Sequence, residues 1–330
     1  MFAPRFWWKP RLTPQAALLW PLGVVYASLA ALNGWLRAQH PYYAGVPVIS
    51  VGNLTVGGAG KTPVVQWLAG HYAAQGVQVA IVSRGYGGSL TGQPTQVDAN
   101  THTAAQVGDE PLLLARHFAN QPVTVWVGNN RPAAVRRAEQ AQAGLIILDD
   151  AFQRRDVARD VDILVLNGMH RAPWGNGLPM PAGPLREFLS RRRRATFAIV
   201  LNEPGGRPLP YYGISAYRMA TVATPRSLAP LKGKKLLAFA GLAQPEKFLA
   251  TLVRNNLRIG AAIAFPDHHA YTADNLEYLQ NRAKKAKLTL VTTSKDAVKL
   301  PQGFARVVDI TLAGPAAADI FHEINIITGL

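Results

Sequence analysis

The chain contains 330 residues, more than one average domain, and 48% of them are hydrophobic, which excludes an intrinsically disordered protein. It has no cysteine, which excludes a disulfide framework and any thiolate metal site. Its 35 Lys and Arg against 19 Asp and Glu give a net charge of +16, so we expect an anionic partner: nucleic acid, an anionic membrane surface or a phosphorylated substrate.

The first predicted element is an uncharged stretch from residue 12 to residue 36. It is flanked by four basic residues, namely Arg5, Lys9, Arg11 and Arg37. The stretch exceeds the roughly 20 apolar residues that a spanning helix needs, although Pro21 interrupts it. Its leucines recur at helical spacing, and tryptophans stand near both ends. We expect residues 1–40 to form a membrane-associated helix that spans or lies on the bilayer; the alternative is a helix docked on the protein's own core.

From residue 41 onward, short apolar runs alternate with helical patterns, which indicates a parallel sheet covered on both faces. We expect strands at residues 46–51, 77–83, 123–127, 145–149, 161–166 and 196–201. A less distinct domain boundary near residues 211–232 precedes a second alternation of strands and helices, with strands at 236–240, 259–265 and 288–292. The predicted organisation is a nucleotide-binding α/β core over residues 41–225 and a smaller α/β lobe over residues 226–330.

The segment SVGNLTVGGAGKTP joins the first of these strands to a helix predicted over residues 63–75. Strand, glycine-rich turn and helix together are the context of a phosphate-binding loop, G-x-x-x-x-G-K-[ST]. Backbone N–H groups at the glycines would surround phosphates, Lys61 would reach the outer phosphates, and the Thr62 hydroxyl would bind Mg²⁺. The expected nucleotide site consists of Thr55, Val56, Gly57, Gly58, Ala59, Gly60, Lys61 and Thr62. The strict motif has glycine where Thr55 stands, but the phosphate cradle lies nearer residues 57–62. The predicted fold class is therefore the P-loop NTPase type.

Two acidic pairs follow along the chain. Asp149 and Asp150 end an apolar strand, where a carboxylate of such folds holds Mg²⁺ directly or through water; the alternative is an exposed strand-end acid in a turn. Asp109 and Glu110 begin a predicted helix. Helix capping explains them from spacing alone, while the alternative is a general base that accepts a substrate hydroxyl proton.

The second lobe and the arginine run contribute weaker signals. His268 and His269 follow Asp267 after a strand of the second lobe, where a histidine beside an acid can orient a catalytic group; a surface turn is the alternative. Residues 191–194 are four consecutive arginines, which suit anionic headgroups or a substrate phosphate. Since no aromatic stacking pattern accompanies them, we expect no nucleic-acid partner.

In their order, these segments resemble the tetraacyldisaccharide 4′-kinase family of lipid A biosynthesis. The resemblance spans nearly the whole chain: the uncharged N-terminal helix, SVGNLTVGGAGKTP, SRGYGG, VGDEP, LDDAFQ, GPLRE, PDHH and TTSKDAVK. It implies transfer of the γ-phosphate of ATP to the 4′-hydroxyl of a tetraacylated glucosamine disaccharide 1-phosphate, which forms lipid IVA. The implied cofactors are ATP and Mg²⁺. The implied location is the cytoplasmic face of the inner membrane, where the N-terminal helix would anchor the protein to an anionic surface.

The resemblance also implies roles for individual residues. The family's loop lacks the first glycine too, so Thr55 is ordinary within it. Asp109 matches the catalytic acid that takes the hydroxyl proton, His268 matches the histidine that supports it, and Lys61 would neutralise charge on the phosphates. Asp149 and Asp150 match the magnesium-side acids. Recurrent positions of the family, expected to contact the acceptor, are Arg84, Glu110, Arg131 and Glu187. Phe188 departs from the proline that the family has after LRE.

Two other classes on the same fold are alternatives. A GTPase or metallochaperone needs a guanine-reading N-K-x-D, and the nearest segments, LNEP and TSKD, lack it. Partitioning-type ATPases carry a lysine immediately before the double glycine, where this chain has Val56. The sequence therefore favours a membrane-associated lipid kinase over a membrane-bound ATPase or GTPase without an acceptor.

Overall fold

The structure is a computed structural model that describes residues 4–168, 173–202, 213–242, 244–267 and 269–330. The larger body contains the strands β1 (Val48–Gly52), β2 (Val79–Ser83), β3 (Thr95–Gln96), β4 (Val123–Val127), β5 (Leu145–Asp149), β6 (Val161–Asn167), β7 (Phe197–Leu201), β8 (Ala216–Ala223) and β13 (Ile310–Ala313). Its helices are α1 (Pro14–Arg37), α2 (Lys61–Ala74), α3 (Ala104–Val107), α4 (Asp109–His117), α5 (Arg131–Gln140) and α10 (Ala317–Thr328). The 3₁₀ helices η1 (Arg5–Trp8) and η2 (Leu189–Arg194) lie in its loops.

The large sheet has nine strands in the order β13-β8-β7-β6-β1-β5-β2-β4-β3 and is parallel except at its two edges. Every residue of β1, β2, β5 and β7 is buried, because helices cover both faces. α2, α4 and α10 pack one face, where Ile49 is buried, and α5 packs the other, where Val48 is buried. The predicted mostly parallel α/β core is confirmed.

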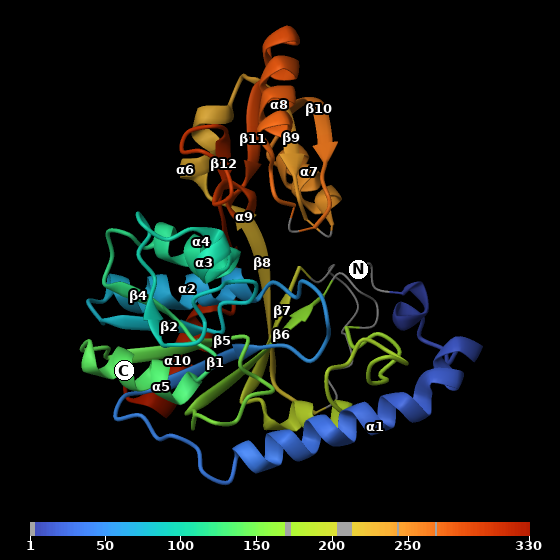
Figure 1. Ribbon diagram of the computed structural model, residues 1–330, viewed down its shortest axis with the longest axis vertical. Helices are drawn as coiled ribbons and strands as arrows, with labels where there is room; N and C mark the ends of the chain where they lie inside the picture. Colours follow the sequence, from blue (N-terminus) through green and yellow to red (C-terminus); the bar gives the residue numbers. More distant parts are fainter. Residues whose placement is uncertain (1–3, 169–172, 203–212, 243, 268) are drawn as a thin grey trace.

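A smaller lobe stands above α4 and β8 in Figure 1. Its four-stranded parallel sheet has the order β10-β9-β11-β12, with β9 (Lys235–Ala240), β10 (Arg258–Ala264), β11 (Thr289–Thr293) and β12 (Arg306–Val308). Its helices are α6 (Pro225–Leu228), α7 (Pro245–Arg254), α8 (Ala273–Lys285) and α9 (Ser294–Ala297), beside the 3₁₀ helix η3 (Ala229–Leu231). The predicted second α/β lobe is thus present.

The chain returns from the smaller lobe to the larger body before it ends. β13 pairs antiparallel with β8, with Ile310 opposite Ala223, and α10 buries Ile320 and Ile324 in the core of the large sheet. Residues 310–330, which we expected in the second lobe, therefore belong to the larger body. The sequence pattern did not reveal this return, because a strand and helix after β12 look the same whichever sheet receives them.

α1 runs along the lower edge of the larger body in Figure 1, as one long helix. Its buried residues are all small: Ala16, Gly23, Ala27 and Gly34. A Cβ on Gly23 would lie 2.9 Å from the carbonyl oxygen of Pro179, so the helix backbone approaches the body closely there. The large apolar side chains face outward instead, and Leu18 is 80% exposed. By length and composition α1 could cross a membrane, yet it is docked along one side by its small residues.

Gly52, the last residue of β1, packs tightly against Phe152 in the turn after β5. A Cβ there would lie 2.5 Å from the Cβ and 2.7 Å from the backbone nitrogen of Phe152. Gly52→Ala should therefore lower the free energy of unfolding by about 1–3 kcal/mol, measured by urea unfolding without nucleotide. Gly92→Ala is the control, since nothing lies within 4 Å of a Cβ there. Equal stability of the two variants would contradict the prediction.

Candidate active site

The phosphate-binding loop lies between β1 and the first residue of α2, Lys61. Gly57 has a φ of 100° and Gly60 a φ of 90°, a left-handed conformation that glycine adopts without strain. A Cβ at Gly57 or Gly58 would meet no atom within 4 Å, so no other part of the protein packs against the loop at these two positions. An open loop of backbone N–H groups at a helix N-terminus is a site for an anion such as a triphosphate.

Thr55 occupies the position of the usual first glycine, and the structure explains why a side chain fits there. Thr55 forms an antiparallel bridge with Leu185, and the N–H of Val56 donates to the carbonyl of Pro184 over 2.8 Å. Its φ is not positive, so no glycine is needed. The segment GPLRE is consequently one wall of the loop.

Lys61 is held between an amide and a carboxylate. Its Nζ donates to Oδ1 of Asn53 over 3.2 Å and lies 3.5 Å from Oδ1 of Asp150. Arg186 donates to both Asp150 oxygens at 3.0 and 3.1 Å. Burial raises the pKa of Asp150, but the charges of Lys61 and Arg186 outweigh it, so the net pKa is lowered and Asp150 stays ionised.

Asp149, at the end of β5, is 1% exposed. The Ser83 hydroxyl lies 3.4 Å from its Oδ2, while among the described residues its Oδ1 has no hydrogen-bond partner. Burial, followed by the charges of Glu110 and Asp150, raises its pKa to about 7. A buried carboxylate oxygen without a partner is costly, and a divalent cation is a group that would satisfy it. The residues at this point therefore fit a magnesium site beside the loop.

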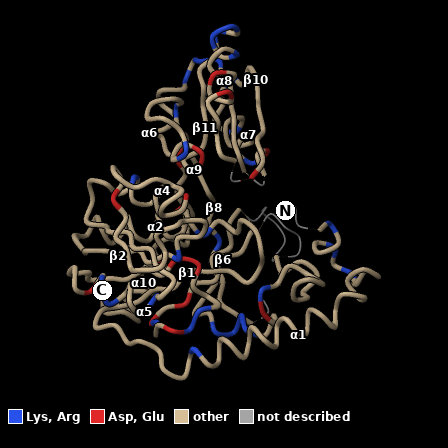
Figure 2. Tube along the Cα trace, in the orientation of Figure 1, with Lys and Arg blue, Asp and Glu red and all other residues tan. Residues whose placement is uncertain are grey.

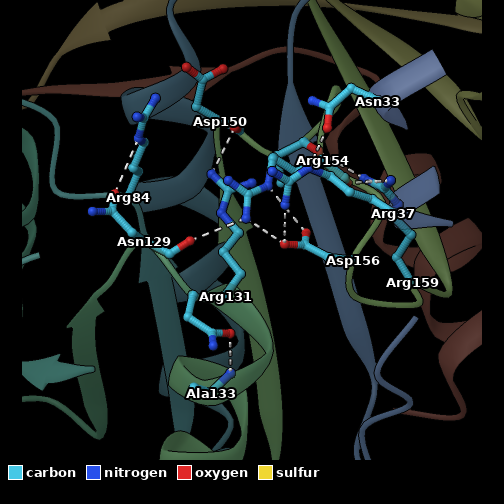
Figure 3. Close-up of polar contacts among 12 residues, drawn as sticks. Asn33, Arg37, Arg84, Asn129, Arg131, Ala133, Asp150, Arg154, Asp156 and Arg159 are labelled. Atoms are coloured by element: carbon cyan, nitrogen blue, oxygen red, sulfur yellow. Dashed lines mark hydrogen bonds and ion pairs between the residues drawn. The ribbon is translucent and has the colours of Figure 1, made fainter. Parts of the chain in front are cut away.

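Arg131, in the first turn of α5, supports the two acids from their backbone side. It is 3% exposed, and its Nη2 donates to the carbonyls of Asp149 and Asp150 over 2.8 and 2.9 Å (Figure 3). Burial, with the neighbouring charge of Arg154, lowers its pKa to about 10, which leaves it charged at neutral pH. Asp150 has a φ of 49°, so these bonds hold a left-handed residue in place.

Asp109 and Glu110 are the first two residues of α4, and Gly108 is its N-cap. Asp109 is therefore in the first turn and not at the cap, so side-chain capping does not account for it. Oδ2 of Asp109 lies 2.9 Å from Nζ of Lys299, and Oε1 of Glu110 lies 3.7 Å from Nζ of Lys295. Both lysines come from the smaller lobe. The charge of Glu110 also contributes to the raised pKa of Asp149.

Of the two predicted histidines, the structure describes only His269. His268 lies outside the described residues. His269 has its Nε2 2.7 Å from Oδ1 of Asn275, and its ring stacks on Phe265 with 4.7 Å between centroids. His269 is thus engaged within its own lobe.

Two further predicted residues have partners of their own. Glu187 is 4% exposed and accepts from Arg194 over 2.9 and 3.0 Å, while the Arg194 guanidinium lies over the Phe152 ring. Arg84 is exposed, and its Nε donates to Oδ1 of Asn129 over 3.4 Å (Figure 3). Glu187 is therefore satisfied inside the protein, whereas Arg84 is accessible to a ligand.

The sequence reasoning assigned no role to four residues of this site: Asn53, Arg186, Lys295 and Lys299. Asn53 and Arg186 stand inside the quoted segments SVGNLTVGGAGKTP and GPLRE, and the lysines stand in TTSKDAVK. The four-residue spacing of the lysines is a signal that both lie on one face of a helical turn. Their acidic partners are about 190 residues away, which no local pattern reveals.

Three comparisons with known proteins agree. A family model described as Tetraacyldisaccharide-1-P 4′-kinase matches residues 15–322. The tetraacyldisaccharide 4′-kinase of Rhodospirillum centenum is 41% identical over 95% of this chain and 93% of that protein, and that of Methylobacterium radiotolerans is 41% identical over 98% of each. The crystal structure of "apo" form LpxK from Aquifex aeolicus in complex with ATP matches with a TM-score of 0.73 and 26% identity, over 94% of this chain and 99% of that chain.

The elevated pKa of Asp149 predicts how stability depends on pH. Its pKa is about 7 in the folded protein against an ordinary 3.8, so the native state holds the extra proton between about pH 4 and 7. Stability contributed by this group is consequently lost as pH rises through that window. Asp149→Asn should raise the free energy of unfolding of the nucleotide-free protein by on the order of 2 kcal/mol at pH 8, and by less at pH 5. Urea unfolding at both values measures this.

The control for this prediction is Asp319→Asn, which removes an exposed acid from the first turn of α10. It should change stability by less than about 0.5 kcal/mol at either pH. A stabilisation by Asp149→Asn that is the same at pH 5 and pH 8 would contradict the assigned titration.

Proposed function

The chain belongs to the Tetraacyldisaccharide-1-P 4′-kinase family, and from this premise we propose how its residues perform the reaction. The protein is an ATP-dependent kinase of lipid A biosynthesis that phosphorylates a tetraacyldisaccharide 1-phosphate at its 4′-hydroxyl. The observation that carries the assignment of residues is the convergence of three elements. Lys61, the first residue of α2, lies 3.5 Å from Asp150 after β5, and the charge of Glu110 at the start of α4 contributes to the raised pKa of Asp149.

We propose that residues 55–62 bind the phosphates of ATP through backbone N–H groups, with Lys61 on the outer phosphates. Thr62, Asp149 and Asp150 would hold Mg²⁺, which neutralises charge on the phosphates when bound. Binding ATP would draw Lys61 from Asp150 toward the phosphates, and Arg186 would keep Asp150 paired. Phosphoryl transfer depends mainly on such positioning and charge neutralisation.

Asp109 is proposed as the general base. The oxygen of the 4′-hydroxyl forms a bond to the γ-phosphorus, the bond from that phosphorus to the ADP oxygen breaks, and the hydroxyl proton passes to Asp109. His268 is proposed to support this step from the smaller lobe. We propose Arg84 and Glu110 as acceptor contacts, since their side chains are accessible.

Supporting roles are proposed for the two buried members of the expected acceptor set. Arg131 holds the main chain of both strand-end acids, which fixes the carboxylates beside the loop. Glu187 holds Arg194 and so fixes the segment that carries Arg186. Neither side chain needs to touch the acceptor for its loss to lower activity.

The lipid acceptor requires access to a bilayer, and α1 suits that requirement. Its small residues face the body, while its large apolar side chains are exposed, including Leu29 at 62% and Trp35 at 57%. Figure 2 shows Lys and Arg along the segments next to α1 and around its N-terminal side. We propose that α1 lies in the interface of an anionic membrane, on the cytoplasmic face of the inner membrane, where ATP is available.

The base role of Asp109 is tested by Asp109→Asn, with transfer of labelled phosphate from ATP to tetraacyldisaccharide 1-phosphate as the measurement. The amide keeps the shape of the side chain but cannot accept the proton. The kcat should fall by about 10²–10⁴-fold while the KM for ATP changes little. Asp319→Asn, on an exposed first turn, is the matched control with unchanged kcat. Near wild-type turnover of Asp109→Asn would leave the α4 acids with a helix-dipole role only.

The loop assignment is tested by Lys61→Ala. Loss of the ammonium should abolish transfer and should also weaken the stabilisation that ATP gives the protein against thermal unfolding. Arg226→Ala, which removes an exposed cation from α6, is the control. An unchanged thermal shift with ATP would argue against contact between Lys61 and the phosphates.

The membrane role of α1 is tested by the double variant Leu18→Gln and Leu29→Gln. Both side chains are exposed, so the fold should be kept, while sedimentation with phosphatidylglycerol vesicles should fall by about 10-fold or more. Ile326→Gln is the control, because Ile326 is a similarly exposed apolar residue, at 70%, on α10 and not on α1. Unchanged sedimentation of the double variant would favour a helix that serves only the protein's own packing.

A further inference from the structure

The segment after α9 connects the two lobes directly beside the proposed base. α9 lies next to α4 in Figure 1. Val298 is buried in the core of the larger body, and Leu300 is buried in the core of the smaller lobe. The carbonyl of Val298 also accepts from Arg116 of α4 over 3.3 Å. Lys299 thus stands between two residues that are packed into different cores, and its backbone position is fixed from both sides.

Lys299 forms the closer of two ion pairs between this segment and α4. Its Nζ lies 2.9 Å from Oδ2 of Asp109, with side chains only 8% and 19% exposed. The pair between Lys295 and Glu110 is longer, at 3.7 Å, and its side chains are 25% and 39% exposed. Because water screens an exposed pair more, the Lys299 pair is the stronger of the two.

α9 itself is anchored to the smaller lobe by a buried acid. Asp296 is fully buried and accepts from the N–H of Gly241 and from the Tyr271 hydroxyl, each over 3.0 Å. The Thr293 hydroxyl caps the helix by accepting from the N–H of Asp296. The segment that leads to Lys299 is therefore anchored in the smaller lobe as well as in the larger body, and it is not a loose loop.

We propose that Lys299 is a positioning residue for phosphoryl transfer, which holds the Asp109 carboxylate in its orientation while the smaller lobe is docked on α4. This inference rests on the proposed role of Asp109 as proton acceptor. Lys299 bonds to neither substrate. When the hydroxyl proton reaches Asp109, the carboxyl becomes neutral and attracts the ammonium less, so the chemical step itself loosens the contact between the lobes.

The test compares kcat and KM for Lys299→Met, Lys299→Arg and Lys285→Met in the full-length protein. Lys299→Met keeps the length of the side chain without its charge, and kcat should fall by about 10–100-fold while the KM for ATP changes less than about threefold. Lys299→Arg should restore kcat to within about fivefold of wild type. Lys285→Met, the control, removes an exposed lysine from the last turn of α8 in the same lobe and should change kcat by less than about threefold. An unchanged kcat for Lys299→Met, or equal values for the Met and Arg variants, would overturn the inference.

A double-mutant cycle separates this inference from the proposed base. Lys299→Met should lower kcat in the wild-type background and change it by less than about threefold in the Asp109→Asn background, because it acts through that carboxylate. Additive effects would overturn the role of Lys299 and leave Asp109 as the base. Wild-type turnover of Asp109→Asn alone would overturn both. Thermal unfolding of each variant distinguishes these results from a loss of folded protein.

Discussion

The site depends on placing carboxylates together beside a loop that must receive a polyanion. Two of these carboxylates, Asp149 and Asp150, stand at the carboxyl end of the central strand β5, and two others, Asp109 and Glu110, begin α4. Negative charges at these positions repel one another and the phosphates, and in addition to burial the charges of Glu110 and Asp150 raise the pKa of Asp149 for this reason. Such an arrangement persists only if cations from elsewhere in the fold compensate it. The compensation comes from separate elements, so the fold as a whole, and no single motif, makes the site stable.

These cations bind different groups of the site. Lys61 and Arg186 neutralise Asp150, whereas Arg131 gives its bonds to main-chain carbonyls. Asp149 is left with an oxygen that none of the described residues satisfies, and its proton affinity is accordingly high. The uncompensated charge is therefore concentrated at the one position where a metal ion would contribute most.

Much of the fold and of the site could be predicted from local pattern. The central strands have continuous apolar sequences because they are buried on both faces, and Gly57 and Gly60 of the loop stand where φ is positive. What the sequence did not reveal was pairing at a distance. The return of residues 310–330 to the large sheet, the lysines opposite α4 and the bridge between Thr55 and Leu185 each depend on partners 85 or more positions away. The N-terminal segment shows the same limit, since its apolar pattern predicted a helix but not that its small residues face the protein.

The return of the chain has a mechanical consequence. The strand that leads into the smaller lobe ends at Ala223, and the strand that leads out begins at Ile310, which is its pairing partner. Both connections to the inserted lobe therefore start from one place on the large sheet. The register between β8 and β13 fixes the two connections relative to each other, because paired strands do not slide past one another without breaking their backbone hydrogen bonds. The position of the inserted lobe over α4 is consequently set by one strand pair, which lets two bodies built on separate sheets supply side chains to one site.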